Sequence, residues 1–210
     1  MEKLVIATRR SQLALWQSEY VKARLLEHYP NMQIELQEFV TKGDKILDVP
    51  LAKIGGKGLF TKELEVAMLE GSAHLAVHSL KDVPTQFEDG LMLAAVTKRF
   101  DPRDAFLSNK YTSLEELPKG AIVGTTSLRR RMALKILRPD IELKDLRGNI
   151  NTRIAKLNAG EYDAIILAAT GIQKLKIENE VKYFSPISTD VIIPSMGQAT
   201  LGIETTNDPK

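Results

Sequence analysis

Strand-like and helix-like segments alternate along the whole chain of 210 residues, and this alternation limits the fold more than any other feature. Short apolar runs such as 4–7 and 164–169 are typical of buried strands. The segment 11–29 instead repeats its apolar residues near helical spacing, which predicts an amphipathic helix. This order, in a chain of this length, predicts an α/β protein with one large domain or two small ones.

The order of strands and helices begins again after about residue 100, which indicates two lobes with a cleft between them. The strands expected from their apolar runs are 4–7, 33–40, 75–77, 92–96, 121–123, 141–143 and 164–169. The helices expected from their periodicity are 11–29, 61–70, 128–137 and 150–157. With crossovers near 100–104 and 191–194, the first lobe comprises 1–97 plus 194–210, and the second comprises 98–193.

Composition and charge exclude several classes of protein. The net charge is only +2, so no overall positive field indicates a nucleic-acid binder, and no aromatic stacking platform accompanies the arginines. Cysteine is absent, which excludes disulfides and thiolate metal ligands, and the three histidines lack the spacing of a metal site. No apolar run reaches membrane-spanning length, and the start lacks a signal peptide. We therefore expect a cytoplasmic protein with no metal, nucleic-acid or membrane partner. We also expect a monomer, although composition does not decide the oligomeric state.

A Ser, a Lys and an Asp are delivered together at the end of the strand 75–77. Ser79, Lys81 and Asp82 follow this apolar run, and Pro84 prevents its continuation as a regular strand. Open α/β sheets bind ligands at the carboxyl ends of their strands. A carboxylate beside a cation suits proton chemistry on a charged substrate, although an ordinary solvated turn has the same composition.

Three strand-to-helix junctions carry arginine where a helix begins, namely 8–11, 125–131 and 146–153. A cation in the first turn opposes the helix dipole at a cost of about 0.3–1 kcal/mol. Together with free N–H groups and hydroxyls, such arginines make strong receptors for anions, and several of them would bind a ligand with several carboxylates. A single arginine of this kind is as often an ordinary surface residue, which we expect for Arg10 and Arg131.

The glycine-rich segment 55–58 resembles a phosphate loop but lacks one requirement. A Walker A motif needs Ser or Thr after Gly-Lys, and Gly58 stands there instead. Nucleotide hydrolysis is therefore excluded. A mobile lid carrying Lys57 and Phe60, or a simple flexible connector, are the two readings of this segment.

The stretches 77–84, 124–130 and 146–153 resemble the porphobilinogen deaminase (hydroxymethylbilane synthase) family. The same likeness extends to 6–9, 51–60, 101–105 and 160–165, so it covers essentially the whole chain. The resemblance implies a transferase of tetrapyrrole (haem) biosynthesis, which joins four porphobilinogen molecules head to tail and releases ammonia. It also implies two lobes like those of type II periplasmic binding proteins, each a mixed sheet flanked by helices, and a third α/β domain.

The resemblance also assigns roles to individual residues. Asp82 is implied as the catalytic carboxylate. The implied binders of cofactor and substrate are Arg9, Ser11, Lys57, Ser79, Lys81, Thr125, Ser127, Arg129, Arg130, Arg147, Gly148, Arg153 and Gln198. The implied lid residues are Gly55, Gly56, Gly58 and Phe60. The implied partners are porphobilinogen and its oligomers.

The chain departs from this family toward its end. Family members carry the dipyrromethane cofactor on a cysteine of the third domain, and the sequence stops at Lys210 with no cysteine. We therefore expect two lobes without the third domain, unable to attach the cofactor and inactive alone. Thr200 also stands where the family usually has glycine. The alternative function is a non-catalytic two-lobed binding protein for a small polycarboxylate.

Overall fold

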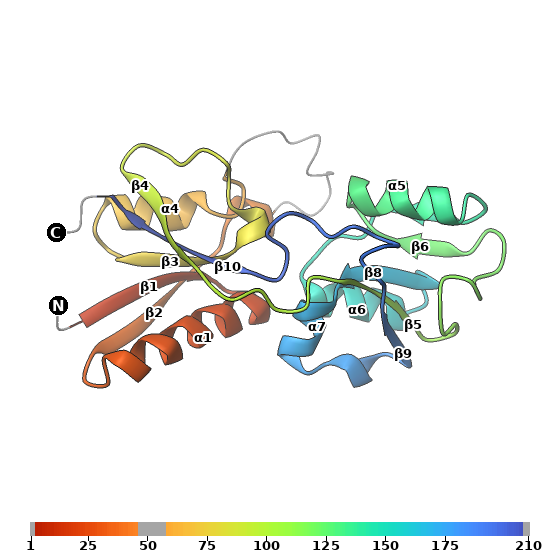
Figure 1. The fold of residues 1–210 in the computed structure, drawn as a ribbon, viewed down its shortest axis with the longest axis horizontal. Helices are drawn as coiled ribbons and strands as arrows, with labels where there is room; N and C mark the ends of the chain where they lie inside the picture. Colours follow the sequence, from red (N-terminus) through yellow and green to blue (C-terminus); the bar gives the residue numbers. More distant parts are fainter. Residues whose placement is uncertain (1–2, 46–57, 208–210) are drawn as a thin grey trace. The chain divides into compact units, whose positions relative to one another are not determined.

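The computed structural model describes residues 3–45 and 58–207. The chain divides into two compact units, one formed by Met1–Arg99 with Ala199–Lys210 and the other by Phe100–Gln198. In the described residues each unit contains one five-stranded sheet with helices on both faces (Figure 1). We call them the first unit and the second unit.

The sheet of the first unit has the strand order β2-β1-β3-β10-β4. Its strands are β1 (Lys3–Arg9), β2 (Gln33–Phe39), β3 (Leu75–Ser79), β4 (Leu91–Val96) and β10 (Leu201–Thr206). β1, β2 and β3 are parallel, whereas β10 runs antiparallel to both β3 and β4. The helical segments are α1 (Gln12–His28), α2 (Lys42–Lys45), α4 (Lys62–Leu69) and the 3₁₀ turn η1 (Leu80–Asp82). The last strand of the chain is thus inserted beside β3.

Helices α1 and α4 cover opposite faces of this sheet (Figure 1). Successive strand residues point to opposite faces, so Ile6 packs in the cluster of α1 with Val21, and Ala7 packs in the cluster of α4 with Leu64. Each face therefore has its own apolar core, and the sheet is buried on both sides.

The sheet of the second unit has the strand order β7-β6-β8-β5-β9. Its strands are β5 (Asp104–Ser108), β6 (Ile122–Gly124), β7 (Glu142–Lys144), β8 (Ala164–Ala168) and β9 (Tyr183–Pro186). β6 is parallel to β7 and β8, and β5 is antiparallel to β8 and β9. The helical segments are α5 (Leu128–Leu137), α6 (Ile150–Asn158), α7 (Ala169–Leu175) and the 3₁₀ turn η2 (Glu178–Glu180).

The continuous apolar run of β8 has a structural reason. Ile166 packs with Leu134 of α5 on one face, and Ile165 packs with Ile154 of α6 and Ile172 of α7 on the other. A central strand that is buried on both faces needs apolar residues at successive positions, not at alternate ones. The mixed α/β sheets flanked by helices that the sequence predicts are therefore present.

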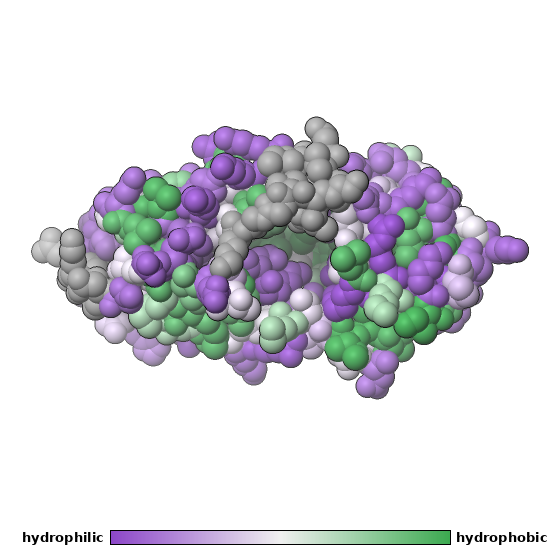
Figure 2. All heavy atoms as spheres, turned by 90° about the horizontal axis from the view of Figure 1, so that it is seen from above, coloured by the Kyte–Doolittle hydropathy of each residue, from purple (hydrophilic) through white to green (hydrophobic). Residues whose placement is uncertain are grey.

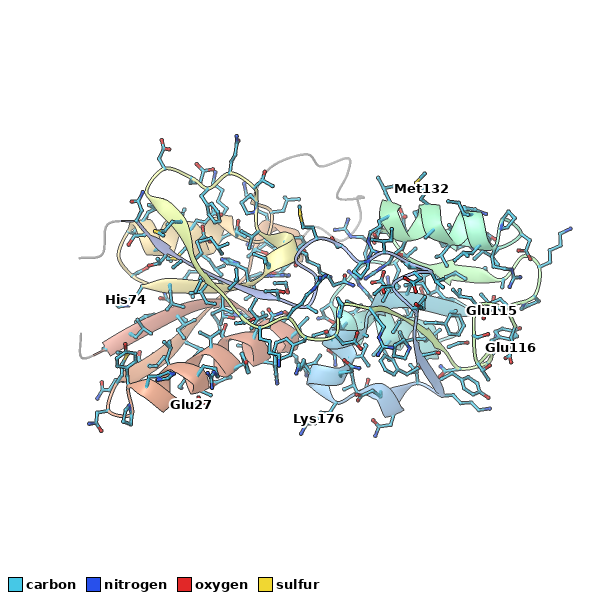
Figure 3. The ribbon with its side chains drawn as sticks, in the orientation of Figure 1. Glu27, His74, Glu115, Glu116, Met132 and Lys176 are labelled. Carbon is cyan, nitrogen blue, oxygen red and sulfur yellow. The ribbon has the colours of Figure 1, made fainter. Side chains whose placement is uncertain are left out.

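Helix α5 carries an exposed apolar stripe on the face opposite to Leu134. The stripe consists of Leu128, Met132 and Ile136, whose exposures are 73%, 70% and 74%. Met132 projects away from the ribbon (Figure 3), and the molecular face that contains α5 shows apolar patches among hydrophilic residues (Figure 2). No described residue covers this stripe.

Several local features could not be expected from the sequence patterns. Trp16 of α1 is only partly buried and stacks on Tyr20 with ring centroids 5.5 Å apart. Thr61 precedes α4, but its hydroxyl donates to the Glu65 carboxylate and makes no capping bond to the backbone. The elements β5, α7, β9 and β10 have no counterpart among the expected segments.

The return of the chain to the first unit falls at residue 199, whereas the sequence suggests 194. The side chain of Gln198 donates from Nε2 to Pro102 O at 2.7 Å and to Asp104 Oδ1 at 2.9 Å. These hydrogen bonds attach the segment 194–198 to the second unit. Among the described helices, none is long and apolar enough to cross a membrane.

Candidate functional site

In the first unit, two parallel strands end at the same edge of the sheet. β1 pairs with β3 through Ile6–Leu75 and Ala7–Ala76. Arg9 ends β1, and Ser79 ends β3 and leads into η1. The predicted residues Arg9, Ser79, Lys81 and Asp82 therefore lie at one sheet edge, as the sequence suggests for ligand binding.

The turn that presents Asp82 is held by the backbone. The Leu80 N–H donates to Thr200 O at 2.9 Å, and the Val83 N–H donates to Leu80 O at 3.2 Å. Lys81 and Asp82 are both exposed on this turn. The Ser79 hydroxyl accepts a 2.7 Å hydrogen bond from Gln17 of α1. A rigid strand end thus carries a carboxylate that is accessible to a ligand.

Arg9 is held by a carboxylate of its own unit. Its guanidinium pairs with Asp44 and lies 4.4 Å from the centroid of the Phe60 ring. Burial alone would raise the pKa of Asp44, but hydrogen bonds from Arg9 and Thr41 outweigh burial and lower that pKa. Ser11 caps α1, because its hydroxyl accepts from the Ala14 N–H at 3.3 Å. Arg10, expected at the surface, is exposed and lies 3.7 Å from Glu38.

In the second unit, the carboxyl ends of β6 and β7 likewise lie at one edge, since the two strands are parallel. Helices α5 and α6 begin just beyond this edge. Ser127 caps α5 by accepting from Arg130 N, and Asn149 caps α6 by accepting from Thr152 N at 2.9 Å. Thr125, which is buried, accepts from the Ser127 N–H with its hydroxyl at 3.3 Å. Hydroxyl groups and helix N-termini are thus gathered at this edge.

Gly148 has a φ of +111°, a conformation that side chains rarely adopt. A Cβ at this position would lie 2.8 Å from Thr152. The Gly148 carbonyl accepts a hydrogen bond from Arg153 Nε at 2.8 Å, and the neighbouring Arg147 is half-buried. Glycine is therefore required for the chain to turn from β7 into α6 and to bring these two arginines to the edge.

Asp104, at the start of β5, binds three predicted site residues. Arg130 Nη2 lies 2.7 Å from Asp104 Oδ1, and Arg129 Nη2 lies 2.7 Å from Oδ2. Gln198 donates to Oδ1 at 2.9 Å. Burial alone would raise the pKa of the fully buried Asp104 carboxyl, but the hydrogen bond and charge of Arg130, followed by Gln198 and Arg129, lower that pKa. Asp104 therefore remains an anion inside the unit.

This arrangement separates the arginines by role. Arg130 is buried and also donates to Ile166 O at 3.0 Å, so part of its donor set serves the interior. Arg129 is partly exposed and donates to Ile193 O. Arg131 pairs with Asp145 and donates to Thr125 O at 3.2 Å and to Leu143 O at 3.1 Å, which fastens the start of α5 to β7.

Asp104 is absent from the predicted site residues, although the sequence contains one signal for it. An acidic residue directly precedes the apolar residues 105–107, and a buried carboxylate needs a cationic partner. The identity of that partner was not readable, because Arg130 is 26 residues away.

Three predicted site residues, Gly55, Gly56 and Lys57, lie outside the described residues. Gly58 has a φ of +77°, and the Phe60 ring contacts Arg9. Neither observation tests the expected lid, which stays a prediction. Within the described residues, no group of three or more His, Asp or Glu side chains is placed to hold a metal ion.

The fold consists of two mixed α/β units, and the chain passes between them twice. This arrangement defines the two-lobed class of type II periplasmic binding proteins. In agreement, the chain resembles the periplasmic aliphatic sulphonate binding protein of Escherichia coli with a TM-score of 0.50 and 15% identity, over 99% of this chain and 62% of that one. This likeness concerns the fold alone.

The family model described as "Porphobilinogen deaminase, dipyromethane cofactor binding domain" matches residues 4–210. The chain is 98% identical over 210 residues to the porphobilinogen deaminase of Aliarcobacter butzleri and 62% identical over 208 residues to that of Sulfurimonas denitrificans. The chain belongs to the porphobilinogen deaminase family, a family of transferases in tetrapyrrole biosynthesis. The first match includes 100% of this chain and 67% of the relative, and the second includes 99% of this chain and 66% of the relative. The chain therefore spans about two thirds of the length of these relatives.

The second unit offers suitable groups for the carboxylates of a dipyrromethane cofactor. The hydroxyls of Thr125 and Ser127, the N-termini of α5 and α6, and the guanidinium groups at this edge have the chemistry that binds anionic oxygens. The covalent link does not fit, because the 210 residues contain no cysteine to form the thioether. These residues can therefore contribute to holding the cofactor but not to attaching it.

Proposed function

We propose that this chain is the substrate-handling part of a hydroxymethylbilane synthase, which joins four porphobilinogen molecules head to tail with release of ammonia. The observation that carries the proposal is the 98% identity to a curated porphobilinogen deaminase over the whole chain. The position of Asp82, exposed at the carboxyl edge of the first sheet, supports its role. A cytoplasmic monomer completes the proposal.

The residues divide the chemistry between them. Porphobilinogen carries an acetate and a propionate, which suit Arg129, Arg147, Arg153 and the hydroxyls of Thr125 and Ser127. Loss of ammonia leaves positive charge on the pyrrole, and the Asp82 carboxylate stabilises that charge as it develops. Lys81 and Arg9 bind substrate or cofactor carboxylates near Asp82. Dipyrromethane, when bound, supplies the first acceptor for the growing chain.

Replacement of Asp82 tests this assignment. In the complete protein, Asp82→Asn removes the charge but keeps the shape, so kcat should fall about 100-fold or more with an unchanged thermal midpoint. Porphobilinogen turnover and thermal unfolding would be measured together. The matched control is Asp89→Asn, an exposed aspartate of the same unit, which should turn over normally. Near-normal bilane formation by the Asp82 variant would refute its role.

A second candidate is a non-catalytic binding protein for a small polycarboxylate. It is favoured by the absence of cysteine, together with hydroxyls and helix N-termini that suit simple dicarboxylates equally well. Calorimetry with porphobilinogen and with succinate separates the two candidates. The synthase requires a clear preference for porphobilinogen, and equal affinity for both would favour the binding protein.

A further inference from the structure

A buried acid–base cluster in the first unit lies outside the residues assigned so far. His78 of β3 places Nε2 at 2.8 Å from Oε2 of Glu204 on β10, and the side chains are 4% and 0% exposed. Glu65 of α4, also buried, belongs to the same surroundings, because Glu204 and His78 are among the charges that act on it. Ionisable groups from β3 and β10 therefore meet inside the first unit, and α4 adds a third buried one nearby.

Sheet register explains how the cluster forms. His78 lies opposite Gly202, and Glu204 lies opposite Ala76, so His78 and Glu204 are diagonal neighbours on one face. This face is the one that α4 covers, since Ala76 packs with Leu64 and Ala67. The pairing of β10 with β4 shifts register between Ile203 and Glu204. Such an irregularity re-aims a side chain and is common beside active sites.

Burial makes the contact between the two side chains energetically important. A buried carboxylate without partners is costly, and Oε1 of Glu204 makes no hydrogen bond within the described residues. The contact of Oε2 with His78 is then the main stabilisation of this carboxylate. Burial raises the pKa of Glu65, and the charge of Glu204 raises it further. A hydrogen bond from Thr61 acts in the opposite direction but does not outweigh them.

The start of β10 is also what holds the turn with Asp82. Thr200 O accepts from the Leu80 N–H at 2.9 Å, and Leu201 pairs with Ser79. A Cβ at Gly202 would lie 3.1 Å from Leu80, so the strand passes close beneath the turn. A slip of β10 along β3 would therefore move η1 directly.

We propose that Glu204 and His78 are positioning residues for Asp82, because their buried contact fixes β10 against β3 and β10 holds the turn Leu80–Asp82. This inference rests on the proposed function of Asp82. Neither residue needs to touch substrate for this role. The acid is supplied by the last strand of the described chain, 126 residues from its histidine partner.

The test uses the complete protein and two independent measurements. Glu204→Leu removes the contact, whereas Glu204→Gln keeps an oxygen that accepts from Nε2. Hydrogen–deuterium exchange of the segment 79–84 reports the bonds of the Leu80 and Val83 N–H groups. We expect Glu204→Leu to raise this exchange about tenfold and to lower kcat about 10- to 100-fold with little change in KM, since small displacements at a reacting group cost this much. Glu204→Gln should restore most of both.

The control variant is Glu35→Leu on β2 of the same sheet, an exposed glutamate paired with Lys3, which should change neither readout. If Glu204→Leu does not fold, Glu204→Asp, shorter by one methylene, should show the same changes to a smaller degree. Normal exchange in 79–84, or raised exchange with normal kcat, would overturn the inference. If the wild-type protein shows no porphobilinogen turnover, the proposed function fails, while the exchange measurement still decides whether Glu204 holds the turn.

Discussion

Among single residues, Asp104 holds three of the predicted site residues inside the second unit. Arg129, Arg130 and Gln198 all contact its buried carboxylate. Two arginines that the sequence predicts as ligand binders therefore form ion pairs within the protein itself. Arg129 is partly exposed, whereas Arg130 is buried.

Removal of Asp104 should leave Arg130 as a buried cation without a counter-charge. Asp104→Ala is expected to lower the free energy of unfolding by about 3–5 kcal/mol, as for other broken buried pairs. Urea denaturation at pH 7 measures this change. The control, Asp145→Ala, removes the exposed partner of Arg131 and should cost no more than about 1 kcal/mol. Equal losses in the two variants would contradict the interpretation.

The pH dependence of stability should carry the signature of Asp104. Its pKa is lower in the folded state than the ordinary value near 3.9, so in acid the unfolded chain binds the proton more readily. The stabilisation is then fully present above about pH 4–5 and is lost as pH falls through the folded-state pKa. The difference in unfolding free energy between wild type and Asp104→Asn should shrink from pH 6 toward pH 3. A difference that is constant with pH would exclude this linkage.

At the scale of elements, the two helices at the edge of the second sheet begin with side-chain caps. Asn149 accepts from both the N–H and the hydroxyl of Thr152, at 2.9 and 3.0 Å. Asn149→Ala should therefore lower the free energy of unfolding by about 1 kcal/mol. Asn149→Ser, which keeps a capping oxygen, should recover most of this loss in the same denaturation experiment. No difference between the two variants would mean that the cap does not stabilise α6.

The two faces of helix α5 differ in burial. Leu134 is fully buried, whereas Ile136 is 74% exposed in the stripe with Leu128 and Met132. Ile136→Lys should change the free energy of unfolding by less than about 0.5 kcal/mol, and Leu134→Ala should lower it by about 2–5 kcal/mol. A large loss from Ile136→Lys in thermal or urea unfolding would show that the stripe is covered in solution.

At the scale of the whole molecule, the chain spans about two thirds of the length of its Aliarcobacter butzleri and Sulfurimonas denitrificans relatives and contains no cysteine. A thioether to dipyrromethane requires a thiolate. The 210-residue protein, incubated with porphobilinogen, should therefore keep its mass in intact-mass spectrometry, whereas a full-length relative should gain the mass of bound pyrroles. A covalent adduct on the 210-residue protein would contradict this expectation.

Much of the fold and part of the site could be predicted from local patterns. Local periodicity predicts the helices at 128–137 and 150–158, and a local apolar run predicts the strand at 164–168. Strand β10 was not predicted, because it contains Gly202 and the buried Glu204 and so lacks a clear apolar alternation. Strand β5 has only three successive apolar residues, 105–107, and directly follows the segment 100–104, which the sequence suggests as a crossover.

The sequence by itself determined the α/β class, the family and the placing of Asp82 and the arginines at the ends of strands. Only the tertiary structure decided which charged groups meet: Gln198 with Asp104, 94 residues apart, and His78 with Glu204, 126 residues apart. The physical reason is range. Helix periodicity, caps and turns depend on neighbours within a few residues, whereas a buried charge is stable only beside a partner that sheet register and packing bring from a distant part of the chain.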